Sequence, residues 1–184
     1  MNVTAVDSTN RLFLVEDILP KDMISQLHNV DWLSLEWKRP TAQEKWLRRE
    51  LAITPELSTL NDSIAVCLPV LEQECNVQFS SMYTTWWLDE PGFKVDIHTD
   101  GHLPSAMQLF WIAESEDFGT AFYNSKNRTD LRHQFMFCPN SGYLMLNGLD
   151  QHGAQPLQWH GMLKRTSTVR ITSYTTFGSY SAKK

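Results

Sequence analysis

The residues with the clearest chemical meaning are a histidine and an aspartate two positions apart, His98 and Asp100. They stand at the end of residues 93–99, FKVDIHT, a run whose β-branched and aromatic residues are typical of a strand. Residues i and i+2 of a strand face the same side, so an imidazole and a carboxylate can reach a common point without distorting the backbone. This spacing predicts two adjacent ligands of a metal ion.

A third ligand has to come from another part of the chain, and two histidines qualify. His152 begins the run His-Gly-Ala-Gln-Pro, and His160 follows it; both precede Arg170. Two histidines and one carboxylate on one face of an octahedron leave three positions open, which is the arrangement of non-haem iron(II) sites that react with O2. If His98 and Asp100 are ligands rather than a surface or core histidine beside an aspartate, either of these two histidines could complete such an iron centre.

A cation that could bind a carboxylate lies near the end of the chain. In the strand-like run TVRITSYTTF, Val169 and Ile171 alternate with Arg170 and Thr172, so the two pairs face opposite sides. If Arg170 faces the interior of a barrel, its buried charge needs an anion. A guanidinium is planar and permanently charged, and it matches the geometry of a carboxylate. Thr172 could donate its hydroxyl to the same carboxylate.

The elements that must position these residues fall into two parts. Residues 12–16 predict a strand, and Pro20 opens a helical stretch, KDMISQLHNV. Residues 54–74 carry apolar side chains at helical spacing, with Pro69 marking a bend or break. After Asn76, seven short β-branched and aromatic runs separated by turn signals predict an antiparallel sandwich or barrel. We expect a mainly β protein with flanking N-terminal helices.

Composition narrows the class of protein. A chain of 184 residues is long enough for one domain with a sizeable core. The net charge of -5 gives no overall basic field for a phosphate backbone, so nucleic acid is not the expected partner, although a local strip of Lys45, Arg48 and Arg49 could still contact it. Three cysteines without CxxC spacing predict reduced thiols. With no signal-peptide pattern and no long apolar run, we expect a cytoplasmic protein without a membrane partner.

Taken in order, these features resemble the superfamily of 2-oxoglutarate/Fe(II)-dependent oxygenases, with its prolyl-hydroxylase-like and AlkB-like catalytic domains. That family carries an HxD motif, then a distal histidine, then an arginine or lysine. The H-x-x-Q-P run at His152 resembles the distal-histidine segment of both branches, which favours His152. His160 lies ten positions before Arg170, a spacing that the superfamily also uses, so the choice stays open.

The resemblance covers about residues 12–177. Three shorter segments also resemble the family in their order along the chain: Val15-Glu16-Asp17-Ile18-Leu19-Pro20, Glu90-Pro91-Gly92-Phe93 and Phe118-Gly119-Thr120-Ala121-Phe122. The implied fold is a double-stranded β-helix, the cupin-like jelly roll. We expect a single domain over residues 1–184, with a strand-helix region at about 12–75 and the jelly-roll core at about 76–177.

The resemblance also implies an activity. It is that of a dioxygenase with Fe(II) held by His98, Asp100 and His152, with 2-oxoglutarate anchored by Arg170 and Thr172, and with O2 as the oxidant. Such an enzyme hydroxylates a peptide side chain or a small molecule and releases succinate and CO2. Two alternatives stay open: AlkB-like oxidative demethylation of nucleic acid, which H-x-x-Q-P favours and the acidic composition disfavours, and a non-catalytic cupin-like binding domain.

Overall fold

The structure is a computed structural model of the whole chain. It describes all residues except 8–10, 39–46, 102, 114–116, 148–157 and 183–184. No helix in this described part combines the length and the apolar character needed to cross a bilayer.

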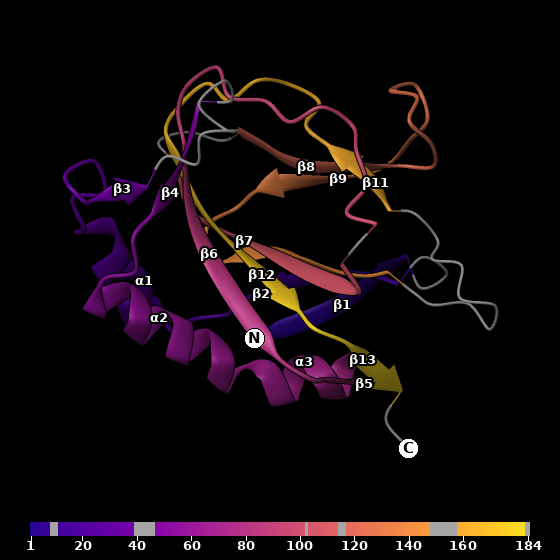
Figure 1. The fold of residues 1–184 in the computed structure, drawn as a ribbon, viewed down its shortest axis with the longest axis horizontal. Helices are drawn as coiled ribbons and strands as arrows, with labels where there is room; N and C mark the ends of the chain where they lie inside the picture. Colours follow the sequence, from indigo (N-terminus) through magenta and orange to yellow (C-terminus); the bar gives the residue numbers. More distant parts are fainter. Residues whose placement is uncertain (8–10, 39–46, 102, 114–116, 148–157, 183–184) are drawn as a thin grey trace.

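The described residues form three helices and thirteen strands, shown in Figure 1. The helices are α1 (Lys21–His28), α2 (Pro55–Val66) and α3 (Leu68–Glu74). The strands are β1 (Asn2–Asp7), β2 (Leu12–Glu16), β3 (Trp37–Lys38), β4 (Arg48–Leu51), β5 (Val77–Phe79), β6 (Met82–Asp89), β7 (Ser105–Ala113), β8 (Asp117–Tyr123), β9 (Leu131–Phe137), β10 (Ser141–Leu146), β11 (Trp159–Gly161), β12 (Arg170–Phe177) and β13 (Tyr180–Ala182).

The strands build a large sheet and a small sheet that face each other. The large sheet has the order β1-β2-β10-β7-β12-β6-β4-β3, and the small sheet has the order β11-β8-β9. All three helices lie along the outer face of the large sheet, while the small sheet covers part of its inner face (Figure 1). Strands β5 and β13 form a separate pair. Two facing antiparallel sheets confirm the predicted jelly roll.

Successive side chains of the large sheet pack into two different cores, one on each face of the sheet. On β12, Ile171 is buried in the core between the sheet and the helices. Tyr174, three residues later, packs instead against the core between the two sheets. Because successive residues of a strand point to opposite faces, Arg170 and Thr172 share the face of Tyr174. Arg170 therefore faces the interior between the two sheets, which is the condition under which the sequence analysis expected it to need an anion.

Most elements lie where the sequence predicts them. The first predicted strand is β2, the helix after Pro20 is α1, and the predicted break in residues 54–74 separates α2 from α3 at Cys67. At the start of α2, Thr54 accepts a hydrogen bond from the backbone N–H of Leu57, which is the role of an N-cap residue.

Two parts of the prediction differ from the structure. The run FKVDIHT is not a regular strand, because of its residues only His98 forms a bridge. The sequence analysis also missed β1, β3, β4, β11 and β13. All but the six-residue β1 have two to four residues, too few alternations for a period of two to be recognised.

Asn140 joins the turn between β9 and β10 to the N-terminal part of the chain. Its side chain accepts a hydrogen bond from the backbone N–H of Leu19 and donates one to the carbonyl of the same residue, both at 2.9 Å. Its φ of 61° lies in the left-handed region, which asparagine tolerates better than most residues. Asn140 therefore fixes the turn and the entry to α1 together.

We expect Asn140→Ala to lower the free energy of unfolding by about 2–3 kcal/mol, from two lost hydrogen bonds and the cost of a left-handed alanine. Asn76→Ala is the matched control, because Asn76 is exposed and has a φ of 52°. The control should lose only about 1–2 kcal/mol in urea unfolding. Equal losses in the two variants would show that the bonds to Leu19 contribute nothing.

Candidate functional site

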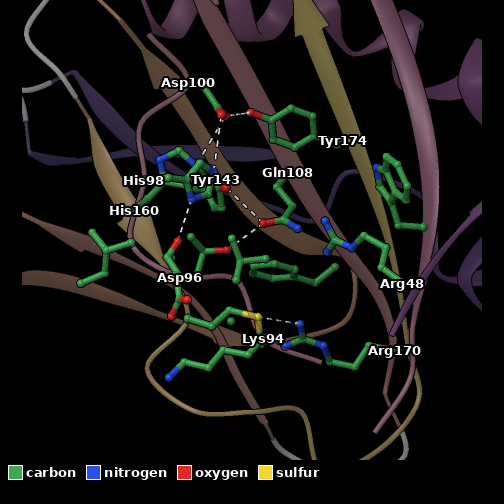
Figure 2. A pocket seen from close by; sticks show the side chains of 18 of the residues that line it. Arg48, Lys94, Asp96, His98, Asp100, Gln108, Tyr143, His160, Arg170 and Tyr174 are labelled. Atoms are coloured by element: carbon green, nitrogen blue, oxygen red, sulfur yellow. Dashed lines mark hydrogen bonds and ion pairs between the residues drawn. The ribbon is translucent and has the colours of Figure 1, made fainter. Parts of the chain in front are cut away.

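A cavity of about 720 Å³ opens between the inner faces of the two sheets. This volume lies within the range of small-molecule sites, about 300–1,000 Å³. The large sheet contributes Gln108, Tyr143, Arg170 and Tyr174 to its wall, and β11 contributes His160. Figure 2 shows these side chains converging on the cavity from both sides.

His98 and His160 face each other across a single antiparallel bridge. The backbone N–H of each donates to the carbonyl of the other, both at 2.9 Å. Residues that exchange both hydrogen bonds have their side chains on the same face, and the two imidazole centroids are 4.4 Å apart. The next residue is a glycine, Gly161, and a Cβ there would approach the backbone of Asp96 to 3.0 Å. This glycine allows the two segments to lie close together.

Each imidazole is oriented by a hydrogen bond from Nδ1 to the backbone carbonyl of the residue two positions earlier. Nδ1 of His98 lies 2.8 Å from the carbonyl oxygen of Asp96, and Nδ1 of His160 lies 2.8 Å from that of Gln158. A carbonyl oxygen only accepts, so each Nδ1 must donate. In the neutral tautomer each Nε2 is then unprotonated and faces the cavity, which is the orientation of a metal-binding histidine with its second-shell partner.

Asp100 completes the group. Its Oδ1 lies 3.5 Å from Nε2 of His98, and its Oδ2 lies 3.4 Å from Nε2 of His160. The hydroxyl of Tyr174 donates to the same Oδ2 at 2.5 Å. Burial opposes the charged form of Asp100, but hydrogen bonds from Tyr174 and from the imidazoles of His160 and His98, which donate from Nε2 when protonated, outweigh it and hold the pKa of Asp100 well below its usual range. Asp100 is thus kept as a carboxylate.

The ligand atoms of His98, Asp100 and His160 all lie within 4.8 Å of one another. Two imidazole nitrogens and one carboxylate oxygen that converge in this way are a donor set suited to iron(II) with three open positions. The hydrogen bond to Asp100 raises the pKa of His98 and outweighs the burial that lowers it. A dication at this point would replace that interaction with Asp100.

His152, which the sequence analysis preferred as the third ligand, lies outside the described residues. Among the described residues, the structure brings His160 to His98 and Asp100. In the sequence, the feature that favoured His160 was its spacing of ten residues from Arg170. The H-x-x-Q-P run favoured His152 and was given more weight, although it carries no information about which backbone segment pairs with His98.

Arg170 is buried, with 3% of its surface exposed, and it lines the cavity away from the histidines. Its Nη1 donates to the carbonyl of Phe118 at 2.9 Å, and its Nη2 donates to Asp89 at 3.1 Å. Nε has no hydrogen-bond partner among the described residues. Thr172 is fully buried, and its hydroxyl also lacks a partner in this part of the chain.

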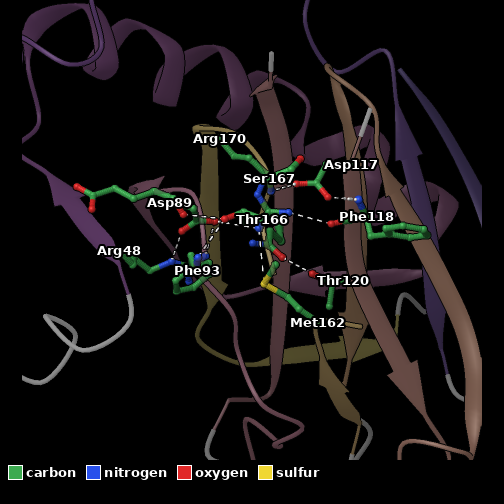
Figure 3. Close-up of polar contacts among 12 residues, drawn as sticks. Arg48, Asp89, Phe93, Asp117, Phe118, Thr120, Met162, Thr166, Ser167 and Arg170 are labelled. Carbon is green, nitrogen blue, oxygen red and sulfur yellow. Dashed lines mark hydrogen bonds and ion pairs between the residues drawn. The ribbon is translucent and has the colours of Figure 1, made fainter. Parts of the chain in front are cut away.

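A second arginine, Arg48, was missed as a site residue. Figure 3 shows Asp89 between Arg48 and Arg170. Asp89 is directly opposite Arg48 of β4 on one side and opposite Arg170 of β12 on the other. Arg48 donates to both carboxylate oxygens of Asp89, from Nε at 2.6 Å and from Nη2 at 3.0 Å. The two guanidinium groups thus share the fully buried carboxylate of Asp89, and the buried carboxylate of Asp117 also attracts Arg170.

Arg48 belongs to the basic strip of Lys45, Arg48 and Arg49 that the sequence analysis considered as a contact for nucleic acid. Arg48 points into the cavity, and Arg49 forms an ion pair with Glu90. Lys45 lies outside the described residues. Arg48 and Arg49 therefore do not form an unpaired basic surface.

A buried polar cluster between the sheets was also missed. Oε1 of Gln108 accepts hydrogen bonds from the hydroxyls of Thr120 at 2.7 Å and Tyr143 at 3.0 Å. Burial raises the pKa of Tyr143 above its usual range, so its hydroxyl stays protonated. In the sequence these residues stand within apolar runs and are indistinguishable from core positions.

The sequence matches no protein-family model and no curated protein. The structure is similar to several solved ones. A prolyl-4-hydroxylase from Pseudomonas putida matches with a TM-score of 0.66 at 12% sequence identity, over 93% of this chain and 94% of that one. A prolyl hydroxylase from Trichoplax adhaerens, in complex with a hypoxia-inducible-factor peptide fragment, matches at 0.65 and 11%, over 93% and 84%. The chain has the prolyl-hydroxylase fold.

The same fold occurs in a protein that has been solved with hygromycin B bound. HygX from Streptomyces hygroscopicus, solved with nickel and 2-oxoglutarate, has a TM-score of 0.63 at 10% identity, over 93% of this chain and 84% of that one. At such identities the likeness concerns the prolyl-hydroxylase fold alone. The roles of individual residues have to come from the geometry of the cavity.

The metal site is tested by comparing two histidines. We expect His160→Ala to weaken Fe(II) binding at least about 100-fold, because loss of a second-shell partner already costs 10- to 100-fold. His152→Ala should change the affinity less than about 3-fold. Anaerobic Fe(II) titration by calorimetry measures both. Loss of binding in the His152 variant alone would return the third position to His152.

Proposed function

We propose that the protein is a non-haem Fe(II) and 2-oxoglutarate-dependent dioxygenase that hydroxylates a peptide side chain or a small molecule. In this proposal His98, Asp100 and His160 hold the iron, and Arg170 and Arg48 bind the far carboxylate of 2-oxoglutarate. One observation carries it: a converging His-Asp-His group shares a cavity with two arginines whose guanidinium groups hydrogen-bond to the same carboxylate, that of Asp89.

The charges of the site fit a dianion. At one end of the cavity Arg48 and Arg170 both hydrogen-bond to Asp89. Asp117, which also attracts Arg170, accepts hydrogen bonds from backbone N–H groups. A dication held by the single carboxylate of Asp100 would leave positive charge at the opposite end. 2-Oxoglutarate has one carboxylate at each end, so one would meet the guanidinium groups and the other the metal. Charge-assisted hydrogen bonds from a guanidinium suit the far carboxylate, because the planar group can donate two parallel bonds.

The residues around this site bind, orient and exclude water. Iron(II), when bound, supplies the reaction of O2 with 2-oxoglutarate, which yields succinate and CO2 and inserts one oxygen atom into a C–H bond of the substrate. The side chain of Arg170 is 4% exposed and that of Arg48 is 15% exposed, so the co-substrate would be shielded at the arginine end. The side chain of His98 is 42% exposed, which leaves the metal end open for the substrate.

Two kinds of substrate are supported by proteins of the same fold. The Trichoplax adhaerens enzyme was solved with a peptide fragment, and HygX was solved with hygromycin B. We do not extend the proposal to nucleic acid, because Arg48 and Arg49 are engaged with Asp89 and Glu90.

The activity can be tested without knowing the substrate. The purified protein with Fe(II), O2 and 2-oxoglutarate should form succinate and CO2 in equal amounts, slowly, as uncoupled turnover. His98→Ala should form no detectable succinate, whereas His28→Ala, at an exposed position of α1, should behave like the wild type. Binding of Fe(II) and 2-oxoglutarate without any succinate would instead support the non-catalytic binding domain.

The arginine assignment predicts a selective loss of affinity. Arg170→Met and Arg48→Met should each weaken binding of 2-oxoglutarate to the Mn(II)-loaded protein by about 10- to 100-fold, the equivalent of one charge-assisted hydrogen bond. Binding of 2-oxobutanoate, which lacks the far carboxylate, should change less than about 3-fold. Calorimetry measures both ligands, and an equal loss for the two would contradict a contact with the far carboxylate.

A further inference from the structure

Tyr174 contacts the metal end of the cavity although it is not one of the three candidate ligands. Its hydroxyl donates to Oδ2 of Asp100 at 2.5 Å, and Figure 2 shows the ring directed at that carboxylate. The backbone of Tyr174 is held on both sides, opposite Gln108 of β7 and opposite Thr85 of β6. A central strand of the large sheet thus fixes the hydrogen-bond donor.

Few hydrogen bonds from its own segment hold Asp100 in place. It lies outside regular secondary structure, where its carbonyl accepts a hydrogen bond from the N–H of Leu103. Among the described residues, Tyr174 is the one hydroxyl group that donates to its carboxylate. The other neighbours of this carboxylate are the Nε2 atoms of His98 and His160, which are themselves candidate ligands. The orientation of Asp100 relative to the histidines therefore depends on Tyr174.

We propose that Tyr174 is a positioning residue that keeps Asp100 a one-oxygen ligand, an inference that rests on the proposed metal centre. The hydroxyl takes one lone pair of Oδ2, whereas both lone pairs of Oδ1 stay free of a hydroxyl donor, so Oδ1 is the oxygen better placed to bind the metal. A carboxylate bound through both oxygens would occupy one of the three positions that a bidentate 2-oxo acid and O2 require. Without the hydroxyl, Asp100 is free to rotate and to chelate.

The chain supplies a matched comparison in Tyr143. Tyr143 lines the same cavity and donates one hydrogen bond, but its acceptor is Gln108 rather than a candidate ligand. Tyr143→Phe and Tyr174→Phe each remove one hydroxyl and leave the ring in place. A difference between the two variants therefore reports on the contact with Asp100 and not on general damage to the cavity.

Co(II) is a suitable probe because it is stable in air and its visible spectrum reports coordination number and geometry. In Tyr174→Phe we expect the Co(II) affinity to fall by about 10- to 100-fold, as for other lost second-shell partners. We also expect the visible bands to differ in position and intensity from those of the wild type. Tyr143→Phe should keep the wild-type spectrum and an affinity within about 3-fold.

The outcomes separate this inference from the proposed function. If the wild type binds Co(II) and Tyr174→Phe has the same affinity and spectrum, the positioning role is wrong while the metal centre stands. If Tyr143→Phe loses as much affinity as Tyr174→Phe, the effect is not specific to Asp100 and the role is also wrong. If the wild type binds no Co(II), the metal centre fails, and the role of Tyr174 fails with it.

Discussion

The two backbone hydrogen bonds between His98 and His160 are the contact on which the site depends. They join the irregular segment before His98 to β11, and through β11 to the small sheet. Because the pair is antiparallel and directly opposed, it sets both imidazoles on one face of the barrel wall. Gly161 permits the close approach, since any larger residue would meet the backbone of Asp96.

The opposite end of the cavity depends on a buried carboxylate. Two guanidinium groups placed side by side would repel each other and would lose their hydration. Asp89 offsets both costs by accepting hydrogen bonds from Arg48 and Arg170. The result is a pair of guanidinium groups held at the cavity wall of a protein whose net charge is -5.

One strand connects the two ends. Arg170 begins β12, and Tyr174 lies four residues later on the same face, roughly 13 Å along the strand at the usual rise per residue. Since β12 lies between β7 and β6 in the large sheet, both side chains start from a rigid backbone. The spacing between an arginine that suits a carboxylate and a tyrosine that holds Asp100 is thus built into one central strand.

The sequence by itself determined the class of fold and most of the helices and strands, and it singled out His98 and Asp100, although their segment is not the regular strand that the i, i+2 argument assumed. These features are local: alternation, helical spacing and an i, i+2 relation can be recognised within a few residues. The same alternation placed Arg170 and Thr172 on the face of the strand opposite to Val169 and Ile171.

Only the tertiary structure decided which histidine faces His98 and which second arginine enters the cavity. Both depend on the register between segments far apart in the chain: His98 opposite His160, and Asp89 opposite Arg48. Register is set by burial on both faces of a sheet and by the hydrogen bonds of neighbouring strands, and short strands such as β4 and β11 carry almost no pattern of their own. For that reason the H-x-x-Q-P run pointed to His152, whereas the fold brings His160 to the other two candidate ligands.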